Sequence, residues 1–559
     1  MAQKSNDDEK RKLVGRAISG AGYLVSVKLA CRVVSFLANI VLLRSLPSDK
    51  GPALIGLSNI GLQLQLQLTL DLAREGVRRA ALRTHYSDSD SSDRATRKRL
   101  HYYIGIVWRW GIFAGVVWAA FFFAVFGWYL VDDESSSRGV PRGSSPAIVA
   151  AAAFVELLSE PLYVIFAFEL EYAFRSFVEG FALIAQCATT LYLVVARERV
   201  ELESFAWGFF ARSTCTLLLY AGGRLARKGT LRDYLEGFLA AFSSAPDAAC
   251  AAFRDLARSL WLQSAWKAVL ARGEKVVLVT SKLDAAEQGV YALVSNLGSI
   301  VARFIFQPVE EVSYTIFGKL NEREKSRSRD LSTAAKGDDI QLSFLFDTLF
   351  KTMTLFGLLF ACFGSQYTHM LLRILYGETW SETSAPSTLS WYCVYVLFMA
   401  LNGITEAFVH GIADQSTLLK FNAWLMLCSI GYLTAAKGLL HWGAIGLVLA
   451  NCINMLLRII FGARFILSQP SLKTTSFSSS IFALPVIAAI AAASAASWFS
   501  KIYVYGDAFS FTGAFAHVAL GLTSFLGCGI ALFVFEQPYL VDVKGMWRMR
   551  RGIASVKED

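Results

Sequence analysis

Ionisable side chains recur deep within long apolar stretches of this 559-residue chain. In the stretch 286–320, Arg303, Gln307 and Glu310 fall on one helical stripe at 3.6 residues per turn. Pro308 removes a backbone donor there and is expected to kink the stripe. Charges at such depth are costly, so they normally face a bundle interior or a watery cavity. The pattern predicts a polar path through a membrane, with charges that snorkel from a helix end as the alternative.

Similar groups occur in other apolar stretches, and they are of three kinds. The candidate anion ligands are Lys28, Arg32, Arg74, Arg303 and Arg458. The candidate partners in ion pairs that switch between two lobes are Glu156, Glu160, Glu274, Glu310 and Glu406. Further polar groups expected to line the cavity are Asn39, Gln307, Asn402, Asn451 and Asn454.

The excess of cations in these stretches favours an anionic ligand. Arginine and lysine in a low-dielectric cavity suit phosphate, and arginine can bind it through two parallel hydrogen bonds. A buried ion network that pairs Glu156 and Glu160 with Lys28 or Arg32 is an alternative that carries at least equal weight. For the asparagines, hydrogen bonding between packed helices is the stronger interpretation. The outer arginines after Arg74, among them Arg78, are expected on a solvated cytoplasmic face.

The composition excludes several classes of protein. The chain is 55% hydrophobic and 18% charged, and its net charge of +10 comes from basic residues in short loops between apolar stretches. This distribution is typical of membrane orientation and predicts no nucleic-acid partner. There is no Walker A loop, and no histidine or cysteine pair has metal-ligand spacing. We therefore expect no enzyme activity, no cofactor and no metal site.

By the criterion of roughly twenty apolar residues per span, the chain contains about fourteen membrane helices. The predicted spans are 16–43, 52–80, 103–130, 147–170, 174–196, 204–222, 260–282, 286–318, 342–364, 387–411, 416–437, 443–467, 480–500 and 510–535. Every second loop is basic, which predicts an even count with both termini in the cytoplasm. The predicted fold class is an all-α, polytopic membrane protein.

The long hydrophilic segment 222–258 divides the predicted spans into two lobes, and its part Leu231–Phe242 could form a short surface helix. The lobes echo each other weakly, which indicates either a parallel six-helix repeat or chance similarity. The predicted domains are a cytoplasmic tail 1–15, a six-helix lobe 16–222, a cytoplasmic linker 223–258, a six-helix lobe 259–468, two additional helices 469–536 and a basic cytoplasmic tail 537–559.

Short motifs along almost the whole chain resemble one protein family. The block GVYALVSNLGSIVARFIFQPVEE, together with LANIVLLRSL, LAREGVRRAAL, VELLSEPLYV, LARGEKVVL, SWYCVYVLFMALNGITEAF and ANCINMLLRI, is similar in sequence and order to the Rft family of endoplasmic-reticulum oligosaccharide-lipid proteins. Ser295 stands where asparagine is common in that family. The segments Ser87–Arg94 and Gly222–Arg258 do not match.

The resemblance implies the fold of the multidrug/oligosaccharidyl-lipid/polysaccharide exporters. That fold has two pseudo-symmetric six-helix bundles around a central cavity, here with two further C-terminal helices. The bacterial peptidoglycan-lipid flippase shares it and uses cavity arginines for its pyrophosphate lipid. The implied location is the endoplasmic-reticulum membrane, and glycosylation-pathway enzymes are candidate further partners.

The implied function is a flippase that moves a dolichol-pyrophosphate oligosaccharide, of the pentamannosyl-chitobiosyl type, from the cytoplasmic to the lumenal leaflet for protein N-glycosylation. Two alternatives stay open. One is an ion-coupled exporter of a soluble metabolite on the same fold. The other is a scaffold that supports the dolichol-linked oligosaccharide pathway without transporting lipid.

Overall fold

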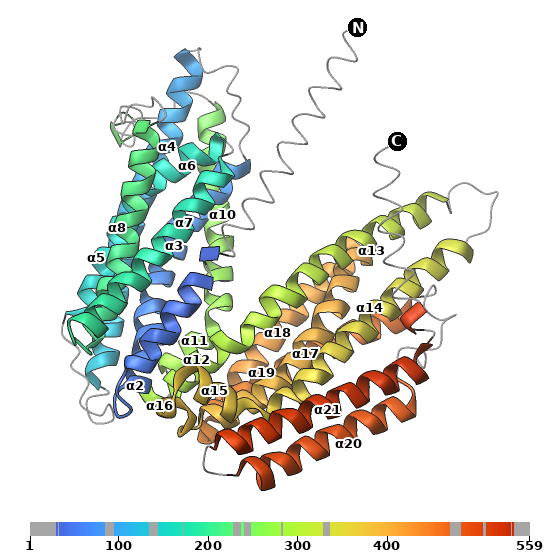
Figure 1. The fold of residues 1–559 in the computed structure, drawn as a ribbon. Coiled ribbons are helices and arrows are strands. Elements are labelled where there is room, and N and C mark those ends of the chain that lie inside the picture. Colours follow the sequence, from blue (N-terminus) through green and yellow to red (C-terminus); the bar gives the residue numbers. More distant parts are fainter. Residues whose placement is uncertain are drawn as a thin grey trace. The chain divides into compact units, whose positions relative to one another are not determined.

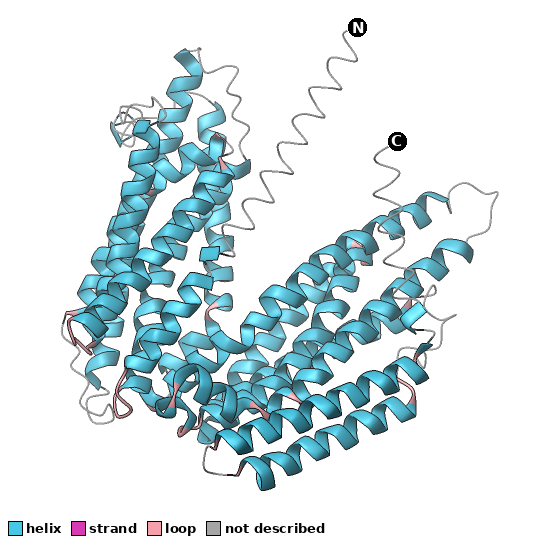
Figure 2. Ribbon diagram, viewed as in Figure 1, coloured by secondary structure: helices cyan, strands magenta, loops and turns pink. Residues whose placement is uncertain are grey.

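The computed structural model describes residues 30–83 apart from Arg32, 94–132, 144–226 apart from 170, 248–280, 283–327, 336–469, 482–506 and 510–541 apart from 538, together with 236, 238 and 239. Nearly all of these residues are helical, and none of them forms a strand (Figure 1, Figure 2). The predicted all-α class is confirmed.

Ten described helices are long and apolar enough to cross a membrane. They are Arg99–Val125, Ser145–Ala167, Ala173–Ala196, Ala285–Asn321, Leu342–Gln366, Ala385–Ile412, Gln415–Gly438, Leu440–Ser468, Leu484–Tyr505 and Phe511–Phe535. Each coincides with a predicted span, so the chain is a polytopic membrane protein.

The predicted count of fourteen is not confirmed, because four of the predicted spans do not meet this criterion of length and apolarity. Three of them coincide with helices rich in polar residues, at 51–83, 202–226 and 248–280. The first predicted span lies largely outside the described residues, which include only a shorter apolar helix, Val33–Ser45.

The chain divides into two compact units, Met1–Gly289 and Val290–Asp559, which are described separately below. The first unit contains α2 Gly51–Gly56, the π-helical turn η1 Leu57–Leu62, α3 Gln63–Arg83, α4 Arg94–Asp132, α5 Ser145–Leu158, α6 Glu160–Phe168, α7 Tyr172–Leu191, α8 Leu202–Ala226, α10 Ala248–Ala271, α11 Gly273–Thr280 and the start of α12 Ala285–Val301.

Helix α3 is the central element of the first unit. It packs against α4, α5 and α10, and α8 packs against both α5 and α7. Leucines at positions 64, 66, 68, 70 and 72 are all buried, which is possible because neighbouring helices cover several faces of α3. On α10, the indole Nε1 of Trp261 donates a hydrogen bond of 2.7 Å to the backbone oxygen of Leu72.

This packing explains why the division between units lies later than the predicted linker at 223–258. Helix α10 begins within that predicted linker, and both α10 and α11 belong to the first unit, where Arg272 pairs with Asp71 at 3.0 Å. The division falls within α12, near Gly289. A Cβ on Gly289 would lie 1.8 Å from the backbone oxygen of Pro52, so only glycine permits this close approach.

The second unit contains η5 Ala302–Phe306, α13 Gln307–Arg327, α14 Lys336–Cys362, α15 Thr368–Tyr376, α16 Glu378–Ser381, α17 Ala385–Ile412, α18 Gln415–Gly438, α19 Gly443–Ser468, α20 Leu484–Ser500 and α21 Phe511–Phe535. Helix α17 is its central element and packs against α13, α14 and α19. The rings of Phe317, Phe346 and Phe408 are fully buried together, with centroids 4.8 Å apart for Phe346 and Phe408.

The last two long helices, α20 and α21, pack against each other and are attached to α14. Lys351 on α14 pairs with Glu536, just after α21, at 2.7 Å, and both side chains are buried. Glu536 also accepts a hydrogen bond of 2.6 Å from the backbone nitrogen of Ala483. A buried pair that is fully hydrogen-bonded fixes the register of these helices on α14.

Candidate functional site

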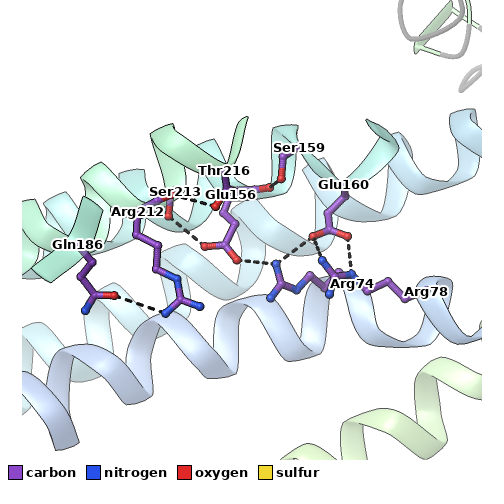
Figure 3. A network of polar contacts seen from close by, with 9 residues as sticks. All are labelled: Arg74, Arg78, Glu156, Ser159, Glu160, Gln186, Arg212, Ser213 and Thr216. Atoms are coloured by element: carbon purple, nitrogen blue, oxygen red, sulfur yellow. Dashed lines mark hydrogen bonds and ion pairs between the residues drawn. The ribbon is translucent and has the colours of Figure 1, made fainter. Parts of the chain in front are cut away.

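The first unit holds a network of arginines and glutamates at membrane depth (Figure 3). Arg74 on α3 donates hydrogen bonds of 2.7 Å to Glu156 and 2.9 Å to Glu160. The two acids lie on either side of Ser159, where α5 ends and α6 begins. That break turns both carboxylates toward α3, so one guanidinium donates hydrogen bonds to two buried acids.

Arg78, one turn after Arg74, corrects a prediction. It was expected on a solvated face, but its side chain is only 21% exposed, and it forms two hydrogen bonds to Glu160, of 2.7 and 2.5 Å. Its guanidinium lies 3.8 Å from the centre of the Tyr163 ring. Arg79, with its partner Glu75, is the more exposed of the two arginines. The helical stripe shared with Arg74, rather than nearness to the helix end, decides where Arg78 points.

The network continues to α8 through two residues that sequence reasoning missed. Ser213 donates a hydrogen bond of 3.1 Å to Glu156. The neighbouring Arg212 reaches only the side-chain oxygen of Gln186, at 3.5 Å. Arg212 is the single charged residue of the predicted span 204–222, and this signal could have identified it. Three arginines and two glutamates of Figure 3 therefore leave a surplus positive charge.

The second unit holds a polar stripe on α17. Asn402 donates a hydrogen bond of 2.9 Å to Glu406, and His410 lies 3.7 Å from the same carboxylate. The carboxylate of Glu310, on α13, lies against the backbone of α17. A Cβ added to Gly403 would lie only 1.8 Å from Glu310 Oε1. These predicted polar residues of α13 and α17 are therefore brought together.

The predicted polar residues of α19 divide into two kinds. Asn451 donates a hydrogen bond of 3.0 Å to the hydroxyl of Tyr291, which is the helix-to-helix contact expected for it. Asn454 Oδ1 and Arg458 Nε are buried atoms without a hydrogen-bond partner among the described residues. Arg458 lies within electrostatic reach of Glu406. Buried polar atoms are nearly always hydrogen-bonded, so these two atoms are candidates for binding a polar ligand.

The residues of the predicted stripe differ in exposure. Arg303 and Gln307 are exposed, whereas Glu310 is half-buried against α17. A π-helical turn, η5 Ala302–Phe306, lies directly before Gln307 and Pro308 and departs locally from the period of 3.6 residues. Arg303 donates hydrogen bonds of 3.2 Å to the backbone oxygen of Asn296 and 2.7 Å to the Ser299 hydroxyl, both on preceding turns.

Three predicted site residues have side chains that the structure does not describe. Lys28 and Arg32 are outside the described residues, and the side chain of Glu274 is not described. Asn39 is half-buried. Glu156 and Glu160, for which Lys28 or Arg32 is the alternative predicted partner, pair with Arg74 and Arg78 of the same unit. Among the described side chains, no group of three or more His, Cys, Asp or Glu could hold a metal ion.

A model of the Rft protein family matches residues 16–545. The chain belongs to the Rft family. Relatives of this Rft family member include the Man(5)GlcNAc(2)-PP-dolichol translocation protein RFT1 of Xenopus tropicalis, 30% identical over 87% of this chain and 89% of the relative. The protein of the same name in Saccharomyces cerevisiae is 27% identical, over 83% of this chain and 85% of the relative. Both relatives are named as translocation proteins.

Solved structures of similar fold are transporters. An inward-facing multidrug resistance MATE family transporter of the MOP superfamily aligns with a TM-score of 0.52 at 14% identity, covering 80% of this chain and 99% of that chain. The lipid II flippase MurJ, in an inward closed conformation, aligns with a TM-score of 0.52 at 13% identity, over 93% and 99%. The fold implied by the motifs is thus confirmed.

Proposed function

We propose that this Rft family member is an intramembrane glycolipid transporter that moves a dolichol-pyrophosphate oligosaccharide from the cytoplasmic to the lumenal leaflet of the endoplasmic reticulum. The observation that carries the proposal is the family match over residues 16–545, together with relatives named for this translocation. The endoplasmic-reticulum location and the cytoplasmic termini belong to the same proposal, supported by the alternating basic loops.

The pyrophosphate ligands in this proposal are Lys28, Arg32, Arg74, Arg303 and Arg458. Arg458 is the best supported of them, because its buried Nε has no partner among the described residues and a phosphate oxygen would supply one. Arg74 would have to exchange Glu156 and Glu160 for the phosphate. Such an exchange is a natural switch, since the acids keep Ser213 and Arg78 as partners while Arg74 is engaged elsewhere.

The acids of the first unit and those of the second unit would have different gating roles. Glu156 and Glu160 form their ion pairs within the first unit, so their proposed role would be to stabilise the packing of that unit. Glu310 on α13 lies against α17, and Glu406 on α17 lies within electrostatic reach of Arg458 on α19, so the two acids would couple movements of these three helices. Substrate release would follow when these carboxylates recover the cations from the phosphate.

A second candidate is an ion-coupled exporter of a soluble metabolite, which the pairing of Glu406 with His410 favours. A carboxylate and an imidazole 3.7 Å apart on a membrane helix could carry a proton during transport. Uptake of a soluble solute into vesicles that depends on Glu406, without any effect on lipid-linked sugars, would support this candidate.

The experiment that tests the proposed function is complementation of a cell depleted of its own Rft protein. The unaltered chain is expected to restore protein N-glycosylation and to remove accumulated dolichol-linked oligosaccharide. Arg303→Ala and Arg32→Ala are expected to abolish complementation at normal protein abundance. Failure of the unaltered chain would overturn the function, and full growth with both variants would remove those two arginines from the ligand set.

A further inference from the structure

The first unit has a second polar feature outside the network of Figure 3. A cavity of about 1070 Å³ runs along its surface between α4 and α10. The two helices are parallel there, since the ring of Tyr103 packs on Phe253 at 4.4 Å and that of Trp110 on Trp261 at 5.7 Å, further along both helices. We call this cavity the α4–α10 groove.

One end of the groove is basic. Arg109 on α4 and Arg254 and Arg258 on α10 line it, and all three side chains lie on exposed positions. The one acid in the lining, Asp255, lies 3.4 Å from Arg254 in a pair that is mostly exposed to solvent. Exposed pairs of this kind contribute little, so the lining keeps a net positive charge.

The other end of the groove is apolar and faces outward. Phe113, Val116 and Val117 line it and are 70%, 51% and 48% exposed. They belong to the stretch 110–131 of α4, which contains no Asp, Glu, Lys, Arg or His. In a membrane-spanning helix this stretch lies in hydrocarbon. Phe113 follows Arg109 by one helical turn, ~5.4 Å, so cationic and apolar surfaces meet over a very short distance.

Phe238, a described residue of the predicted linker 223–258, lines one side of the groove. Phe238 packs against Trp108 with ring centroids 5.2 Å apart, and Glu236 lies 3.4 Å from His101. Leu239 is 72% exposed next to them. Glu236, Phe238 and Leu239 are helical and fall within the surface helix considered for Leu231–Phe242. An apolar residue exposed beside anchored ones is typical of a helix that lies in the membrane interface.

We propose that the α4–α10 groove binds an anionic phospholipid of the surrounding leaflet. Arg254, Arg258 and Arg109 hold its phosphate, and an acyl chain lies over Phe113, Val116 and Val117. Arginine suits this role because its planar fork matches phosphate oxygens. The net positive lining favours a headgroup with surplus negative charge, since a zwitterionic headgroup would bring its own cation against the arginines.

The bound lipid would hold Phe238 in place beside α4 and α10. Its headgroup would lie between α10 and Phe238, which lines the groove. The proposal does not depend on the transported substrate, because every lining residue belongs to the first unit and none is among the proposed pyrophosphate ligands.

The test uses the purified full chain in a neutral detergent, with phosphatidylinositol or phosphatidylcholine carrying a photoreactive group on one acyl chain. We expect saturable crosslinking by phosphatidylinositol within residues 109–117 and 254–258, at least tenfold above that of phosphatidylcholine. Arg254→Gln combined with Arg258→Gln is expected to reduce it about tenfold. Val116→Trp, at an exposed position, is expected to reduce it as well by filling the groove while leaving every charge in place.

The matched control is Lys319→Gln combined with Lys420→Gln, which removes two exposed cations of the second unit and is expected to leave crosslinking unchanged. Equal crosslinking by the two lipids would overturn the proposal, as would an equal loss in the control, because either result means non-specific lipid contact. Displacement of phosphatidylinositol by an equimolar amount of dolichyl pyrophosphate would also overturn it and assign the groove to the substrate.

Discussion

The two units treat their membrane-depth charges in opposite ways. In the first unit, Glu156 and Glu160 are buried and each has an arginine partner within 2.9 Å. In the second unit, Glu406 is held by neighbours on its own helix, and Arg458 keeps a buried Nε without a partner among the described residues. We call the first arrangement a closed network, because both acids have arginine partners. We call the second an open network, because a buried donor of Arg458 has no hydrogen-bond partner among the described residues.

This difference teaches that charge at membrane depth is not by itself evidence for a ligand. A closed network stabilises the bundle that contains it and resists the removal of any member, because a stranded buried charge is costly. An open network leaves interaction energy for a ligand to supply. We therefore expect substitutions in the first unit to act mainly on folding and those around Arg458 to act mainly on transport.

The largest effect is expected from Glu160→Ala. Glu160 is 1% exposed, and its removal leaves Arg74 with one partner and Arg78 without its carboxylate. Breaking a buried pair in this way costs about 3–5 kcal/mol, so the yield of monodisperse protein and its melting temperature should both fall sharply. Glu75→Ala is the control, because the Glu75–Arg79 pair is far more exposed and should cost about 1 kcal/mol or less.

Arg458→Gln should separate transport from folding. The side chain has an unsatisfied donor, so its removal is expected to leave protein abundance and melting temperature close to normal. A lost charge-assisted hydrogen bond to phosphate, about 1.5–3 kcal/mol, would weaken glycolipid binding by roughly 10- to 150-fold. A large drop in melting temperature with unaltered binding would instead place Arg458 in a closed network like that of the first unit.

Gly403→Ala probes the contact between α13 and α17. The new methyl group would overlap the Glu310 carboxylate, which must turn away, at a cost of about 1–2 kcal/mol. Glu310→Ala in the same chain should recover most of that loss, as a double-mutant cycle of melting temperatures would show. Additive losses would mean that Glu310 does not rest on Gly403.

A local contact outside both networks should give the smallest effect. Asp414 precedes α18, and hydrogen bonds from Ser416 and Thr417 lower its pKa to about 2. Because the folded pKa lies below the unfolded value near 4, its stabilisation is full above that value and is lost as pH falls through about 2. The difference in melting temperature between wild type and Asp414→Ala should therefore be small and constant from pH 7 to about 5, then vanish toward pH 2.

The sequence was sufficient for the helical class, the family and most of the membrane helices, because apolar length and motif order are local properties. It could not place the partners of Arg78 or Glu536, since each depends on which helices pack together. The sequence did not indicate the π-helical turn at Ala302–Phe306, because an apolar run carries no local signal for a change of helical period. Arg212 was detectable as a lone charge in an apolar span but was overlooked.

The central claim is that this chain itself moves a pyrophosphate glycolipid across the bilayer, with Arg458 as a ligand. The direct measurement is leaflet exchange of labelled dolichol-pyrophosphate oligosaccharide in vesicles reconstituted with the purified chain alone. We predict exchange well above that of protein-free vesicles, reduced at least tenfold by Arg458→Gln and unaffected by Glu75→Ala. Exchange no faster than in empty vesicles, from protein that is folded and inserted, would contradict the account and favour a non-transporting scaffold.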